Sequence, residues 1–309
     1  MPSLAQVLKV LDLEQNGADK FTGGNISIPT GAVYGGQFLA QSIIAASRTT
    51  SEYRFPNSMH AYFIKSGDLK KEICYTVDRL RDGVKFSHRE LSASQKVDNR
   101  EVLAFRSLLN FHEKEDSALD FSAEIPDVPL PEEVQKLSDR FLERGVKGEW
   151  GNYFINEAPF EVRQISPSLF LTQDDTPDRI EAAWFRINPE DVEMFKKMTA
   201  EQFGNNSETL NRALLAFISD QFAFSPAIRK SNLNWMTHGA SYVSLDHSQH
   251  FHRAVDLSKW HLIYGTSPAG ANARGIGVSN IFSIAGDCVS TVVQEGSIRV
   301  ADHDSSVKF

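Results

Sequence analysis

The sequence predicts an α+β fold in which two tandem antiparallel sheets are each wrapped around a central helix. Two long segments contain mainly apolar and small residues, and each is followed by a series of short strand-like runs. A charged, proline-containing stretch separates the two series. Antiparallel strands can be joined by short turns, so a helix followed by successive strands is typical of one such unit. The 309 residues suffice for two units of ordinary size.

The first unit contains the segment Val33 to Ala46, which opens near Gly35 and Gly36 and has the composition of a helix buried on most sides. Four runs rich in β-branched and aromatic residues follow: Ser58 to Ile64, Glu72 to Leu80, Val84 to Ala93, and Glu101 to Phe111. Short turns separate them, and these include Arg81, Asp82 and Gly83, and Asp98 with Asn99. This pattern predicts an antiparallel meander.

The stretch from Glu113 to Pro131 breaks the periodic pattern with charges and with Pro126, Pro129 and Pro131. Lys136 to Trp150 is expected to form a short helix after it. We therefore expect an N-terminal unit over residues 1–115, a linker over 116–154, and a C-terminal unit over 155–309.

The second unit repeats the order of the first. A segment near Val162 and the strand-like run Ala182 to Ile187 precede the second helix, Leu210 to Phe224. Four strand-like runs follow this helix: Tyr242 to His252, Trp260 to Thr266, Ile276 to Ala285, and Val289 to Val300. At a constant offset of 188, four residues of the first half recur and one lysine is matched by an arginine: Phe63, Lys65, Asp68, Leu69 and Lys71 match Phe251, Arg253, Asp256, Leu257 and Lys259. This internal repeat of residues at a constant offset indicates a duplication.

The helix Leu210 to Phe224 carries apolar residues around nearly its whole circumference. A sheet curled around such a helix buries it, and two copies side by side can pair their sheet edges. The predicted architecture is therefore a double hot-dog.

Composition excludes several functional classes. The formal net charge of −8 opposes nucleic-acid binding, no apolar run is long enough to insert into a membrane, and Met1 to Asn16 lacks the features of a signal or transit peptide. Cys74 and Cys288 are far apart and lack zinc-site spacing, so both are interpreted as small buried apolar residues in a reducing compartment.

Asp220 is a candidate catalytic residue, because it places a carboxylate on a helix wall otherwise made of apolar groups. The alternative is that this residue meets solvent near the helix end. Gln294 is a second candidate: it follows the apolar run Val289 to Val293, and an amide can donate and accept together. Its alternative is a structural hydrogen bond.

The strand Tyr242 to His252 alternates in polarity. Period two sends Ser244, Asp246, Ser248, His250 and His252 to one face and Leu245 and Phe251 to the other. His247, His250 and His252 either belong to a solvated or hydrogen-bonded surface or ligate a metal, but nothing nearby completes a zinc set. No nucleophile elbow, Walker loop or dinucleotide fingerprint is present, and no cofactor or metal is expected.

The chain resembles the type II acyl-CoA thioesterases along most of its length. The likeness rests on YGGQFLAQ (Tyr34 to Gln41), SMHAYFIKSGD (Ser58 to Asp68), YTVDRLRDGVKFSHR (Tyr75 to Arg89), AFISD (Ala216 to Asp220), VSLDHSQHFH (Val243 to His252), ARG (Ala273 to Gly275) and QEGSIRV (Gln294 to Val300). It implies a double hot-dog that hydrolyses fatty acyl-CoA to a fatty acid and coenzyme A. The family's acid, hydroxyl and amide fall on Asp220, Ser244 and Gln294, which would hold an attacking water without an acyl-enzyme.

Three departures from the family pattern stand out. Gln249 and His250 replace Met and Trp of the DHSMWFH motif, and Ser244 stands where bacterial members have Thr. The stretch from Asn188 to Glu208 is longer than in bacterial relatives and adds an amphipathic segment, Asp191 to Phe203.

Further residues are candidates for substrate contacts. Gly35 or Gly36 would bring backbone donors close to the thioester carbonyl, where a helix N-terminus favours negative charge. His60, Arg81, Asp82 and Gly83 match the active strand and turns of the second half, and Arg81, Arg89 and Arg274 are candidates for the coenzyme A phosphates. The first half's counterpart of Gln294 is expected at Ser107, which suggests one complete site per chain.

Location, assembly and two rival functions complete the expectations. Val307, Lys308 and Phe309 resemble a peroxisomal address read by an import receptor, with a cytoplasmic location as the alternative. Sheet edges favour a homo-oligomer. A non-catalytic acyl-CoA sensor and an enoyl-CoA hydratase are the rivals, although the hydratase normally needs a His near Asp220 on the helix, where this chain has none.

Overall fold

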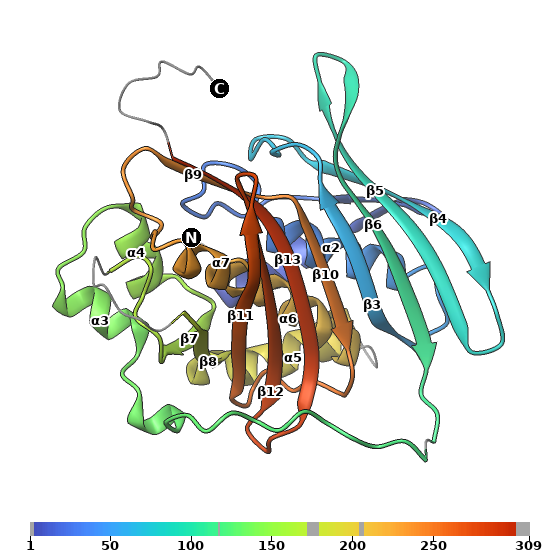
Figure 1. The fold of residues 1–309 in the computed structure, drawn as a ribbon. Coiled ribbons are helices and arrows are strands. Elements are labelled where there is room, and N and C mark those ends of the chain that lie inside the picture. The colour runs from blue at the N-terminus through green and yellow to red at the C-terminus, as the bar shows by residue number, and fades with distance from the viewer. Residues whose placement is uncertain (1–2, 117, 172–178, 204–206, 301–309) are drawn as a thin grey trace.

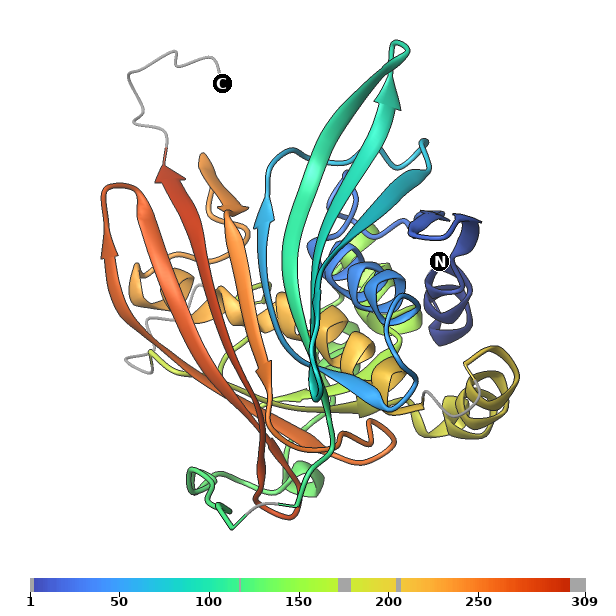
Figure 2. The same ribbon diagram turned by 90° about the vertical axis from the view of Figure 1, so that its right-hand side faces the viewer.

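A single antiparallel sheet encloses two central helices in the computed structural model, which describes residues 3–116, 118–171, 179–203 and 207–300. The strand order is β1-β2-β4-β5-β6-β3-β10-β13-β12-β11-β8-β7, and β9 pairs with β13 beside this path. Figures 1 and 2 show the sheet curving around α2 and α6, which lie side by side on its concave face. This α+β arrangement confirms the predicted double hot-dog.

The first half contains two helices and six strands: α1 (Leu4–Leu11), β1 (Glu14–Gly17), β2 (Lys20–Gly23), α2 (Gly35–Ser47), β3 (Arg54–Phe63), β4 (Ile73–Asp82), β5 (Phe86–Val97) and β6 (Arg100–Glu113). The predicted helix and four strands correspond to α2 and β3–β6, while α1, β1 and β2 were not expected. Cys74 is exposed, so its predicted burial was wrong: strand alternation sends its neighbours Ile73 and Tyr75 inward instead. Cys288 is buried as predicted.

The connecting segment forms the turn η1 (Pro131–Glu133) and two helices, α3 (Leu137–Glu143) and α4 (Glu149–Asn156). A single short helix was expected here. Gly145 and Gly148 have φ angles of 60° and 89°, a region that other residues rarely adopt, and they interrupt the helix between its two parts.

The second half contains β7 (Phe160–Gln164), β8 (Glu181–Ile187), η2 (Pro189–Asp191), α5 (Val192–Gln202), α6 (Ser207–Ala223), α7 (Ser225–Lys230), β9 (Ala240–Ser244), β10 (Asp246–Phe251), β11 (His261–Ala271), β12 (Arg274–Ser283) and β13 (Cys288–Val300). The strand predicted over Tyr242 to His252 is broken at Leu245. That residue bonds to two different strands, donating to the Glu295 carbonyl and accepting from the Phe63 amide.

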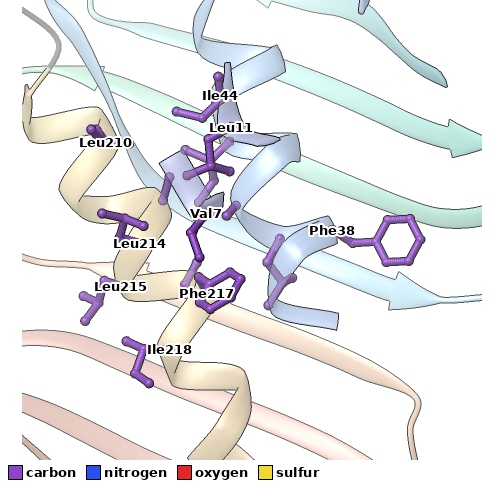
Figure 3. Close-up of a cluster of buried hydrophobic side chains, with 14 of the residues drawn as sticks. Val7, Leu11, Phe38, Ile44, Leu210, Leu214, Leu215, Phe217 and Ile218 are labelled. Atoms are coloured by element: carbon purple, nitrogen blue, oxygen red, sulfur yellow. The ribbon is translucent and has the colours of Figure 1, made fainter. Parts of the chain in front are cut away.

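The two halves share one sheet and one core. Strands β3 and β10 pair across the junction, with His60 opposite Ser248. Below the sheet α2 packs on α6, and buried side chains of α1, α2 and α6 form one cluster (Figure 3). Leu210, Leu214 and Leu215 of α6 are all 0% exposed, as expected of a helix that is apolar on every side. No helix in the described residues is long and apolar enough to span a bilayer.

Candidate active site

The carboxylate of Asp220 meets the first turn of the other central helix. Asp220 lies in the last turn of α6, and its Oδ2 accepts a 2.8 Å hydrogen bond from the backbone N–H of Gly36, the second residue of α2. The first N–H groups of a helix have no partner within it and carry partial positive charge. Helix α2 therefore stabilises a carboxylate that belongs to the other half of the chain.

Gln294 links Asp220 to Ser244. Its side chain is 0% exposed on β13, and its Nε2 donates to Asp220 Oδ1 at 3.1 Å and to Ser244 Oγ at 2.7 Å. The acid, hydroxyl and amide, separated by up to 74 residues in sequence, are thus in direct contact. The structure brings together the three residues on which the sequence analysis placed the catalytic set.

Opposing effects act on the pKa of Asp220. Burial in the apolar wall raises the pKa, and the hydrogen bonds from Gln294 and Gly36 lower it but offset the burial only in part, so that the net pKa is about 6 instead of 3.8. The group is therefore ionised at neutral pH but more basic than an ordinary carboxylate.

Two glycines allow the elements to approach closely enough to form this site. A Cβ on Gly277 of β12 would lie 1.9 Å from the carbonyl oxygen of Ala223, and one on Gly36 would lie 2.3 Å from that of Phe217. Backbone contact of this kind fixes α6 against both the sheet and α2. Asp220, which lies between Phe217 and Ala223 on α6, is held in place by both contacts.

An open cavity of about 620 Å³ lies beside the three residues, with Asp220 and Ser244 in its wall. Its other walls are largely aromatic and come from both halves: Tyr34 and Phe63 from the first half, Trp150, Tyr153 and Phe154 from α4, and Phe170, Trp235 and Tyr242 from the second half. Apolar walls with a few polar groups at one place are typical of a site for a mainly apolar ligand.

Gly35 also lines this cavity, as the first residue of α2. The N–H of Gly36 is already bonded to Asp220, so the N–H of Gly35 is the donor of that helix end for which the described residues provide no partner. A Cβ at Gly35 would lie 2.7 Å from Asp220 Oδ2. The geometry therefore requires glycine here.

Five of the other predicted contact residues lie away from this cavity. His60 points from the outer face of β3, where its Nδ1 is 3.1 Å from Ser248 Oγ, because Met59 and Ala61 take the inward positions. Arg81, Asp82 and Gly83 form the turn at the opposite end of the sheet from Phe63. Arg89 is 1% exposed and donates to the Thr49 hydroxyl, to Asp82 and to three backbone carbonyls, so it is structural.

Arg274 remains near the site. It begins β12, its side chain is 48% exposed, and its Nε donates to Glu295 Oε1 at 3.0 Å. The adjacent Gly275 pairs with Gly296, which in turn pairs with Ser244. Lys65, which the sequence analysis named in the internal repeat but not as a substrate contact, lines the cavity directly.

The break at Leu245 corrects the predicted polar face of the strand. Ser244 reaches the inward-facing Gln294, whereas Ser248 contacts His60 on the outer face, so the two serines point to opposite sides of the sheet. His247 and Gln249 are both 0% exposed on the inner face, and His250 lies outside. Among the residues the structure describes, no group of three or more His, Cys, Asp or Glu side chains is placed to hold a metal.

Comparisons with known proteins agree with this architecture. A family model described as "Acyl-CoA thioesterase" matches residues 196–297, and one described as "Acyl-CoA thioesterase N-terminal domain" matches residues 26–112. Human acyl-coenzyme A thioesterase 8 is 29% identical over 98% of this chain and 92% of its own. The Saccharomyces cerevisiae peroxisomal acyl-coenzyme A thioester hydrolase 1 is 24% identical over 99% and 98%.

Among solved structures, the tesB protein of Mycobacterium avium subs paratuberculosis superimposes with a TM-score of 0.73 at 25% identity, covering 96% of this chain and 99% of that one. Fold and comparisons together define a double hot-dog protein of the acyl-CoA thioesterase class. Within that class, the chain belongs to the type II acyl-CoA thioesterase family.

Proposed function

We propose that the chain hydrolyses fatty acyl-CoA thioesters to a free acid and coenzyme A by direct attack of a water held by Asp220, Ser244 and Gln294. The single observation that carries this proposal is the contact of Gln294 with both Asp220 and Ser244, which line one aromatic cavity. The expectation that the substrate is an acyl-CoA thioester comes from the relatives, which are named as acyl-CoA thioesterases or as a tesB protein.

In this mechanism Asp220 accepts the proton of the water as the water oxygen attacks the thioester carbonyl carbon. Ser244 can bond to that water directly, and Gln294 contributes to the position of the water by holding Asp220 and Ser244 through its two N–H groups. The tetrahedral oxyanion then collapses, the carbon–sulfur bond breaks, and the coenzyme A thiolate leaves and takes up a proton. No covalent acyl-enzyme is needed.

The oxyanion would be stabilised by the N–H of Gly35 at the start of α2. This donor lines the cavity next to Asp220, and preorganised backbone donors at a helix end stabilise developing negative charge. The sequence analysis did not decide which half of the chain supplies the backbone N–H donors for the oxyanion. The position of Gly35 in the cavity wall supports the first half.

We assign the acyl chain to the aromatic part of the cavity. Lys65 at its wall and the exposed Arg274 near Ser244 are the candidates for the coenzyme A phosphates, because both are cations close to where the thioester must lie. Arg81 and Arg89 are too distant or too buried for this role.

The test is the release of free coenzyme A from palmitoyl-CoA by the wild type and by Asp220→Asn, Ser244→Ala and Gln294→Ala. We expect Asp220→Asn to reduce kcat by roughly 1,000-fold, with smaller losses for the other two. Because Cys74 is exposed, a thiol reagent needs an enzyme-only control. Tight binding of palmitoyl-CoA without release of coenzyme A by the wild type would instead support the acyl-CoA sensor.

The enoyl-CoA hydratase alternative is disfavoured by the surroundings of Asp220. The nearby buried histidine, His247, contacts Gln294 on the side away from Asp220 and does not line the cavity. A hydratase Asp–His pair facing the substrate is therefore missing from the described residues.

We further propose a peroxisomal location, which is supported by the name of the yeast relative. The tripeptide Val307, Lys308 and Phe309, expected to bind an import receptor, lies outside the described residues. A fluorescent protein fused to the N-terminus should give punctate fluorescence that becomes diffuse when the tripeptide is removed. Homo-oligomer formation also remains a prediction, and sedimentation of the purified chain tests it.

A further inference from the structure

His247 lies directly behind the proposed catalytic amide. It projects inward from β10, is 0% exposed, and its Nδ1 is 2.8 Å from Oε1 of Gln294. It does not line the cavity and has no contact with Asp220 or Ser244 among the described hydrogen bonds. Among the described hydrogen bonds, its direct link to the proposed catalytic set is therefore the one to Gln294.

The two ends of the Gln294 amide are not interchangeable. An ionised Asp220 carboxylate can only accept, so the amide must present its NH₂ group to Asp220 and Ser244. Its carbonyl oxygen then faces His247, which must donate from Nδ1. If the amide turned over, its oxygen would face the acceptor-only carboxylate, and the hydrogen bond to Asp220 would be lost.

His247 is suited to hold this orientation. Its burial lowers the pKa of the imidazole to about 4, so the ring is neutral at physiological pH and has one N–H to donate. The Oγ of Ser219, itself 0% exposed, lies 3.4 Å from Nε2, but its hydroxyl has a nearer acceptor in the Ala216 carbonyl at 3.0 Å, so Gln294 Oε1 at 2.8 Å is the closer partner of the ring. Ser219 belongs to the same helix turn as Asp220.

We propose that His247 is a positioning residue for hydrolysis: by donating from Nδ1 to Gln294 Oε1, it keeps the amide NH₂ turned toward Asp220 and Ser244. This inference rests on the proposed function, since it assumes that Gln294 orients the water. It goes beyond that function because it adds a fourth residue that never contacts the substrate.

Three variants test the proposal. His247→Leu removes the donor, while His247→Asn keeps an N–H near the position of Nδ1. His261→Leu is the matched control: His261 is also buried, at 2% exposure, and bonds only locally to the Lys259 carbonyl, far from the cavity. Steady-state kinetics with palmitoyl-CoA are measured for each folded variant between pH 5 and 8.

For His247→Leu we expect kcat to fall by roughly 100-fold with KM nearly unchanged, because the water is misplaced while the acyl pocket is intact. His247→Asn should recover most of this loss, and His261→Leu should keep wild-type kcat. The acid limb of the plot of kcat against pH should also shift to higher pH in His247→Leu. A turned amide no longer donates to Asp220, and the pKa of Asp220 therefore rises further.

A His247→Leu enzyme with wild-type kcat and an unshifted acid limb would overturn the proposal. So would equal losses in His247→Leu and His247→Asn. If Gln294→Ala itself leaves turnover unchanged, the proposed function fails instead, and the two failures are thereby distinguished.

Discussion

Among single residues, Asp220 faces two opposing requirements in its proposed role as general base. A general base must be ionised near neutral pH, yet it must be basic enough to accept a proton from water. Burial supplies the basicity, and the hydrogen bonds from Gln294 and Gly36 keep the carboxylate charged. Both effects come from residues that are distant in sequence.

The first prediction concerns the pH dependence of turnover. Because the pKa of Asp220 is raised to about 6, kcat/KM should fall tenfold per pH unit below about pH 6 and level off above it. Initial rates in buffers of constant ionic strength from pH 4.5 to 8 measure this limb. A midpoint near the ordinary carboxylate value would contradict the role of burial.

The second prediction concerns stability. A carboxyl group whose pKa is raised on folding destabilises the folded state at pH values above its folded pKa, and this cost disappears below the unfolded pKa. Asp220→Asn should therefore raise the free energy of unfolding by up to about 3 kcal/mol at pH 8 and by less at pH 5. Urea unfolding of both proteins at the two pH values gives the comparison; an equal effect at both would rule out the linkage.

The third prediction concerns the close approach at Gly35. A Cβ there would lie 2.7 Å from Asp220 Oδ2, so Gly35→Ala should displace the carboxylate and reduce kcat by roughly 100-fold. Gly24→Ala is the matched control, because no atom lies within 4 Å of an added Cβ at that position. Similar kinetics for both variants would show that the contact is unimportant.

At the scale of elements, the connecting segment contributes to the site itself. Helix α4 places Trp150, Tyr153 and Phe154 in the cavity wall, and Trp150 packs against Phe170 with ring centroids 4.8 Å apart. A segment expected to act as a linker thus supplies part of the proposed acyl pocket.

The fourth prediction follows from that wall. Trp150→Ala should raise KM for palmitoyl-CoA, because burial of a large aromatic surface against the acyl chain is lost. Acetyl-CoA, whose acyl group is too short to reach far along the wall, serves as the internal control and should show little change. Equal effects on both substrates would place Trp150 outside the acyl site.

At the scale of the whole molecule, the duplication produced two units with only one proposed site. The offset of 188 that relates the halves maps His60 onto Ser248, and these two residues pair with each other at the junction. The same relation places Met59 where the second half has His247. The pairing of β3 with β6 then places Leu109, and not the expected Ser107, where the second half has Gln294. The first half therefore has apolar residues at both positions.

The fifth prediction is that neither half works alone. Gly35 and Gly36 belong to the first half, Asp220, Ser244 and Gln294 to the second, and the cavity has walls from both. A fragment of residues 116–309 should not hydrolyse palmitoyl-CoA, and co-expression with residues 1–115 should restore turnover. Activity of the separate fragment would show that the first half is dispensable for the site.

Local pattern predicted most of the elements. Helices α2 and α6 and the strands of both meanders were predictable, because a helix that is apolar on all sides and strands bounded by turn residues leave a strong periodic signal. Short elements with mostly exposed residues, such as β1, left no comparable signal, and neither did the break at Leu245. That break depends on hydrogen bonds to Phe63 and Glu295, which are remote in sequence.

Periodicity and turn residues were enough to predict the double hot-dog fold, and resemblance to a family identified Asp220, Ser244 and Gln294. The groups that surround these three residues became known from the packing of distant segments. Strand parity could place His247 on the inner face, but its contact with Gln294 depends on the pairing of β10 with β13. The absence of His60 and Arg89 from the cavity wall has the same origin. The burial and direction of a side chain follow from packing between distant segments, whereas sequence periodicity records only which residues are apolar.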